Sequence, residues 1–245
     1  MNARTYPALP TKLLRFGVIL LVAAAILPSV ARAGSLTLAH NKLIWPSAAL
    51  AFPTGRFGTP DPATNHAGHK TGFDAGLDFG YAFNDLFTAG ISGEYLRFPM
   101  DFGNADIGPN SDPNSARTSV LLGQVWMRAF WPGGFAHWKP YALFAVGMGG
   151  PRARINSRED SLISYVKFSV NTSLAITGGI GVLIPVSNTL AFSFEPRLRR
   201  ISTKGSKLTE IAYLKDGTSE TVLEDHQKSN TTWWELRAGL TLMVK

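Results

Sequence analysis

GFDAGLDFGYAF, residues 72–83, alternates without a break between two kinds of side chain. Phe73, Leu77 and Phe79 take odd positions, whereas Asp74 and Asp78 take even ones. Successive side chains of a β-strand point to opposite faces of its sheet. The stretch therefore predicts a strand with one large apolar face and one face of small or acidic residues.

The same alternation recurs along the chain, and eight strands are predicted. They cover residues 43–53, 72–83, 86–98, 118–131, 139–154, 168–184, 189–201 and 232–244. The joins near 84–85, 132–134 and 187–188 are short, whereas those at 54–71, 99–117, 155–167 and 202–231 are long. Short periplasmic turns and long outer loops are typical of outer-membrane barrels. We therefore predict an all-β fold, an eight-stranded antiparallel up-and-down transmembrane β-barrel in the outer membrane of a Gram-negative-type bacterium, with both termini periplasmic.

A soluble sandwich or lipocalin would show the same two-residue period, with its apolar face turned inward. The membrane interpretation is favoured because the glycine-rich face suits a narrow interior and aromatic residues gather at the strand ends. One predicted belt holds Trp45, Tyr81, Phe83, Phe87, Trp131, Trp138 and Tyr141, and the other holds Phe52, Phe73, Tyr95, Phe98, Trp233 and Trp234. Within segment 139–154, both faces of Tyr141–Met148 are apolar or small, and we favour Phe144, Val146 and Met148 outward.

Residues 1–33 have the features of a cleaved secretory signal peptide: a basic start, an apolar core and the cleavage site Ala31-Arg32-Ala33. Four of the 24 basic residues and none of the 17 acidic ones lie in this segment, so the net charge falls from +7 to +3 when it is removed. The remaining barrel domain, 34–245, is too weakly basic to predict nucleic-acid binding. The absence of cysteine excludes disulfides and thiolate metal sites.

Nine ionisable residues fall on the inward face of the predicted strands. They are Asp74, Asp78, Glu94, Arg128, Glu195, Arg197, Arg199, Glu235 and Arg237. Buried charges persist only when they are paired and hydrogen-bonded, and an eight-stranded barrel is just wide enough for side chains to fill it. We therefore interpret the set as a salt-bridged plug, in which Glu195 and Arg237 are a candidate pair. A proton relay, an ion path or a carboxylate active site is the alternative.

The long loops offer little catalytic or metal-binding chemistry. His66 and His69 lie in one loop without further ligands, and we expect neither a metal nor another cofactor. No histidine shares a strand face with a serine at H-x-S spacing, and we expect no enzymatic activity. In the last loop, Lys207–Leu214 and 218–224 flank an Asp-Gly turn signal and predict a hairpin that extends the last two barrel strands.

Basic residues gather near the outer ends of the predicted strands. Among them, Arg97 and Arg200 lie on the lipid-facing side, where the lipid headgroups should begin. Contact with phosphates of lipopolysaccharide would explain this placement, because juxtamembrane cations are attracted to anionic lipid. A solvated rim is the alternative.

AFPTGRF at 51–57, KPYALFAVGMG at 139–149 and the final alternation ending at Val244 carry a resemblance that covers the mature chain. The pattern resembles the small outer-membrane β-barrel family of the OmpA transmembrane-domain and OmpX type. The resemblance implies contact with outer-membrane lipid and insertion by the outer-membrane assembly machinery. Such chains usually finish on an aromatic residue, whereas this one finishes Met-Val-Lys, so recognition would rest on the alternation from Trp234 onward.

Two classes of function follow from these predictions. The first is a structural or surface-display protein with a plugged interior, whose extracellular loops serve adhesion or envelope integrity through an unidentified surface ligand. The second is a narrow pore or transporter for small or hydrophobic solutes.

Overall fold

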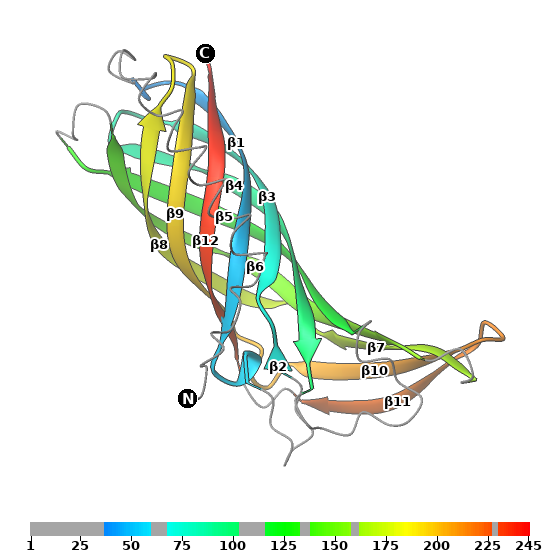
Figure 1. The fold of residues 1–245 in the computed structure, drawn as a ribbon. Helices are drawn as coiled ribbons and strands as arrows, with labels where there is room; N and C mark the ends of the chain where they lie inside the picture. Colours follow the sequence, from blue (N-terminus) through cyan, green and yellow to red (C-terminus); the bar gives the residue numbers. More distant parts are fainter. Residues whose placement is uncertain (1–36, 60–67, 103–115, 133–137, 158–161, 227–229) are drawn as a thin grey trace, which may run out of the picture.

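The structure is a computed structural model that describes residues 37–59, 68–102, 116–132, 138–157, 162–226 and 230–245, so the predicted signal peptide lies outside the described residues. Eight antiparallel strands form a closed barrel (Figure 1). They are β1 (Lys42–Thr54), β3 (Gly72–Ala82), β4 (Phe87–Asp101), β5 (Arg117–Phe130), β6 (Lys139–Asn156), β8 (Ser173–Pro185), β9 (Leu190–Ile201) and β12 (Thr231–Val244). The barrel closes because β1 pairs with both β3 and β12, which confirms the predicted fold.

One boundary was wrong. The segment predicted as a strand over 168–184 is interrupted, because residues 168–170 belong to a separate strand, β7 (Ile163–Val170). The first five residues of β7 lie in the predicted loop 155–167. Gly149 pairs with Ser173 and Arg152 with Ser169, so three steps along β6 face four steps along the opposing chain. The extra residue is a β-bulge, which bends a sheet and increases its local twist.

Beyond this bulge, β7 joins β10 (Lys207–Leu214) and β11 (Ser219–His226) in a sheet of order β6-β7-β10-β11, which we call the wing. The wing projects sideways from one end of the barrel (Figure 1). The predicted hairpin is confirmed: Gly217 at its turn has a φ of +88°, a conformation that favours glycine. Its predicted attachment was wrong in part, because β10 pairs with β7 rather than extending the wall made by β9 and β12.

The strands point their side chains as predicted. The outward face is apolar, as shown by Ile91 and Val125, each 60% exposed, and by Phe144, Val146 and Met148, whose predicted facing is confirmed. Such a continuous apolar surface is unusual for a soluble protein and suits contact with acyl chains. No helix in the described part of the chain is long and apolar enough to cross a membrane.

Four predicted belt residues lie inside the barrel instead: Trp45, Phe98, Tyr141 and Trp233 are all buried. Each stands on the inward parity of its strand, so the prediction erred by using depth along the strand without facing. Tyr81, Phe83, Phe87, Trp131 and Trp138 remain exposed at the end with the short turns, and Phe73, Tyr95 and Trp234 at the end with the long loops.

The first prediction concerns the outward band. Val125 lies opposite Ile91 on β4 and Val146 on β6, within the apolar surface. We expect Val125→Arg to lower the free energy of unfolding by about 2–4 kcal/mol, because a charge on the lipid face must leave water. Urea titration of the protein in lipid vesicles measures this. The control is Leu162→Arg, because Leu162 lies just before β7 and is 83% exposed. Equal losses for both variants would contradict a lipid-facing Val125.

Candidate functional site

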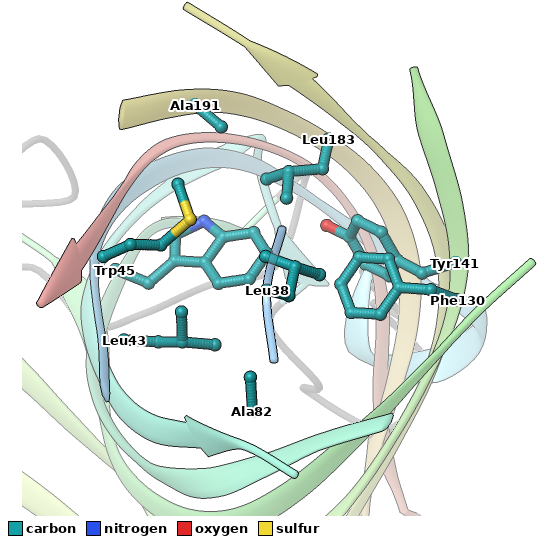
Figure 2. Close-up of a cluster of buried hydrophobic side chains, with 9 residues drawn as sticks. Leu38, Leu43, Trp45, Ala82, Phe130, Tyr141, Leu183 and Ala191 are labelled. Carbon is teal, nitrogen blue, oxygen red and sulfur yellow. The ribbon is translucent and has the colours of Figure 1, made fainter. Parts of the chain in front are cut away.

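The interior of the barrel is filled by three layers of side chains. The layer nearest the short turns is aromatic and aliphatic (Figure 2) and consists of Leu38, Leu43, Trp45, Ala82, Phe130, Tyr141, Leu183, Ala191 and Met243. The rings of Trp45 and Tyr141 approach edge to face with centroids 5.9 Å apart. Leu38, from the segment before β1, lies between these two rings in Figure 2 and is fully buried. The layer fills the interior at this end of the barrel.

The middle layer is ionic, and it contains all nine predicted interior charges. They come from five strands: β3 (Asp74 and Asp78), β4 (Glu94), β5 (Arg128), β9 (Glu195, Arg197 and Arg199) and β12 (Glu235 and Arg237). Every one of these residues is buried. The predicted set is thus brought together in one cluster, which we call the ionic core.

Arg197 lies at the centre of the ionic core. Its guanidinium ion-pairs with Asp74 at 3.0 Å and Glu94 at 3.1 Å, and with Glu195 at 3.5 Å. It also ion-pairs with Glu235, which lies directly opposite on β12. One arginine thus joins carboxylates from β3, β4, β9 and β12, and the planar guanidinium fork suits such multiple contacts.

Two more arginines share the same acids. Arg237 contacts Asp78 at 2.8 Å and Glu94 at 3.1 Å. Arg199 ion-pairs with Glu94 and contacts Glu235 at 3.0 Å. Glu94 therefore accepts from three arginines, and the four arginines together balance four of the five carboxylates of the ionic core.

Arg128 links the ionic core to the aromatic layer. It contacts Asp78 at 2.8 Å and Glu195 at 3.3 Å. Its guanidinium also lies over the rings of Trp45 and Trp126, 3.8 and 4.3 Å from their centroids, in a cation–π arrangement. The hydroxyl of Tyr141 donates to Glu195 at 3.0 Å, so both layers hold one another in place.

The third layer fills the interior at the end with the long loops. Its members are Ala51, Phe57, Leu96, Phe98, Val120, Leu122, Ala175, Ile201 and Trp233. Phe57 comes from a short 3-10 helix, η2 (Gly55–Phe57), that follows β1. Its ring packs edge to face against the ring of Phe98, with centroids 5.2 Å apart. The indole N–H of Trp233 donates to Glu235 at 2.5 Å, which connects this layer to the ionic core.

His69 fastens the first loop over this end. It lies in β2 (Gly68–His69), which pairs with the end of β4. Its ring stacks on the ring of Phe57, with centroids 4.1 Å apart. Its two ring nitrogens lie 2.9 Å from the Phe57 carbonyl oxygen and 2.7 Å from the Thr118 hydroxyl. Thr118 is only 3% exposed, so a substrate would have no access to this hydroxyl. His66 lies outside the described residues, among which no group of three metal-ligating side chains occurs.

The two predicted lipid contacts do not form one site. Arg97 and Arg200 are both exposed on the outward surface, on β4 and β9. In the closed order β1-β3-β4-β5-β6-β8-β9-β12 these strands are four places apart in either direction. They therefore lie on opposite sides of the barrel.

No protein-family model matches the sequence, and no curated protein sequence matches it. Solved structures do. A major outer membrane protein from Thermus thermophilus is 12% identical, with 84% of this chain and 100% of that chain covered and a TM-score of 0.60. OprG from Pseudomonas aeruginosa is 12% identical, with 85% and 98% covered and a TM-score of 0.51.

The chain has the fold of a small outer-membrane β-barrel. This confirms the predicted architecture and the resemblance to small barrels of this type. Both compared proteins are outer-membrane proteins by name, and the apolar outward band of this chain supports the same location. At 12% identity the likeness extends to the fold alone.

The ionic core was predicted as a set, but its pairing was not. Glu195 and Arg237 lie directly opposite on β9 and β12, yet Glu195 pairs with Arg128 and Arg197 whereas Arg237 pairs with Asp78 and Glu94. Sequence reasoning also missed Trp45, Tyr141 and Trp233 as interior partners of the charges. Their inward parity was the available signal.

The second prediction follows from these contacts. A double-mutant cycle of Asp78→Asn and Arg128→Met should give a coupling energy of about 1–3 kcal/mol, because the two side chains are in direct contact. The control cycle, Glu195→Gln with Arg237→Met, should give a smaller coupling. Urea unfolding in detergent micelles measures both cycles, and an equal or larger value for the control would show that the pairing described here is wrong.

Proposed function

We propose that this protein is a sealed outer-membrane barrel that serves as a structural and surface-display protein, with no catalytic role. The observation that carries the proposal is the filled interior: an ionic core held between two layers of large apolar side chains. Chemistry or transport inside the barrel requires space and access for water or a solute. A salt-bridged plug requires neither.

The filled interior argues against the pore that the sequence left open as the alternative. An ion would have to pass Trp45 and Tyr141 at one end and Phe57, Phe98 and Trp233 at the other. Neighbouring barrel strands are also paired all the way round the wall. A lateral route for hydrophobic solutes would require a gap in that wall.

The part of the molecule that is left to act is the wing. The wing adds three strands to the end of the barrel with the long loops. Within it, Tyr165 on β7 stacks on Tyr213 on β10, with ring centroids 4.4 Å apart. The short joins at 83–86 and 186–189 lie at the opposite end. Because short turns are periplasmic in barrels of this type, the proposal places the wing outside the cell and both termini in the periplasm. There the wing presents an ordered surface for adhesion or for envelope contacts. The assembly machinery inserts the barrel from the periplasmic side.

The third prediction tests the seal. The purified protein in planar lipid bilayers should give no steady single-channel conductance, because its three interior layers leave no continuous path. A known porin provides the positive control. Steady openings whose amplitude changes in Arg128→Ala would overturn the sealed barrel in favour of a narrow pore.

The fourth prediction tests orientation and display. A protease site inserted between Asp216 and Gly217 should be cleaved in intact cells, since this turn ends the β10–β11 hairpin. The same site inserted between Ser187 and Asn188 should be cleaved only after the outer membrane is permeabilised. The reverse pattern would mean that the wing faces the periplasm.

A further inference from the structure

Three cations occupy one row across neighbouring strands at the base of the wing. Arg117 on β5 lies directly opposite Arg154 on β6, and Arg154 lies directly opposite Lys167 on β7. All three stand on the outward parity, the one that carries Leu121 on β5 and Met148 on β6. Side chains directly opposite in a sheet have Cβ atoms about 4.5–5.5 Å apart, and like charges there repel.

A second row lies one step closer to the apolar band. Arg97 on β4 is opposite Ser119 on β5, which is opposite Arg152 on β6. One further step down, Tyr95 and Leu121 are opposite one another and half or more exposed. Each step of two residues is about 6.6–6.8 Å, so both cationic rows lie within about 14 Å of the outermost apolar row. We call these five cations the basic face: Arg97, Arg117, Arg152, Arg154 and Lys167.

The basic face carries no carboxylate of its own to offset the repulsion. Within the described residues, no ion pair joins any of its five cations to an acid. This contrasts with the ionic core, where each arginine contacts at least two carboxylates. In the part of the chain that the structure describes, the interior cations thus have acidic partners and these outward cations have none.

Arg154 of the basic face is held in one orientation by its neighbours. The Nε atom of Arg154 donates to Asn156 Oδ1 at 2.9 Å, and its guanidinium stacks over the Tyr165 ring at 3.8 Å. These contacts fix the plane of the guanidinium, and neither uses its two terminal nitrogens. A planar guanidinium held in this way is suited to bidentate contact with a phosphate.

We infer that the basic face binds the phosphate groups of lipopolysaccharide in the outer leaflet. The two rows begin where the apolar band ends, the level at which lipid phosphates lie, and juxtamembrane cations are attracted to such anions. The inference keeps Arg97 from the sequence prediction and excludes Arg200, which lies on the opposite side of the barrel beside Thr232 and Ile176. It rests on the proposed orientation, which puts this end of the barrel in the outer leaflet.

The test measures the thermal unfolding midpoint of the intact protein in mixed micelles with increasing mole fractions of lipopolysaccharide. A ligand that binds the folded protein raises this midpoint. The test variant is Arg117→Gln with Arg152→Gln and Arg154→Gln. It should need roughly a hundredfold more lipopolysaccharide for half of the full shift, because each juxtamembrane charge contributes about fivefold. The matched control removes three charges elsewhere, Lys42→Gln with Arg200→Gln and Lys204→Gln, and should behave as the wild type.

Three outcomes would overturn the inference. Equal weakening in the control variant would indicate an effect of net charge alone. Equal stabilisation by dephosphorylated lipopolysaccharide would show that the phosphates are not the ligand, and equal stabilisation by inorganic phosphate would indicate a free anion. Replacing the same three arginines by lysine should restore part of the shift and guards against a folding defect. Because micelles have no sidedness, failure here would leave the protease test of orientation unaffected.

Discussion

Charge that is enclosed by a lipid-exposed wall must be neutralised inside that wall, and the rest of this barrel depends on that constraint. Five carboxylates and four guanidiniums from β3, β4, β5, β9 and β12 meet in the ionic core. A slip of one residue in any barrel strand would turn its inward set toward the acyl chains. For β3, such a slip would place Asp74 and Asp78 in lipid and Phe73, Leu77 and Phe79 in the interior. The ionic core thus penalises wrong registers strongly, whereas an apolar filling of the same volume would penalise them far less.

The aromatic layers at the two ends make this arrangement effective. Removal of water strengthens every ion pair, but it also raises the cost of any charge without a partner. Trp45 and Trp233 meet both requirements. Each excludes water from its end of the barrel, and each also contacts the ionic core: Trp45 contacts Arg128, and Trp233 contacts Glu235. The three layers of the interior therefore contact and support one another. The charged side chains are engaged in ion pairs with each other, which makes them poor candidates for a proton relay or an active site.

The sequence carried the strand count, the facing and the membership of the ionic core, because all three depend on a local two-residue period. Asp74 and Arg128 could be placed inside by parity alone. Their partners could not be predicted, since an arginine side chain crosses a narrow interior as easily as it reaches the neighbouring strand; Arg197, for example, contacts acids from four strands. The wing was missed in part for a different reason. β7 is separated from β8 by a single bulge, and a bulge shifts the register of the sheet without a clear change in residue type.

In the proposed sealed barrel, only the outer surface can meet other molecules. That surface is graded along the barrel: an apolar band, then the row of Arg97 and Arg152, then the row of Arg117, Arg154 and Lys167, and then the wing. The two cationic rows lie on the strands from which the wing grows. Any anion that binds them also restrains the base of the wing, because Lys167 belongs to β7 and Arg154 stacks on Tyr165, which in turn stacks on Tyr213 of β10. If the basic face binds lipid and the wing is displayed, as proposed, this chain of side-chain contacts joins the two, and bound lipid is expected to restrain the orientation of the wing.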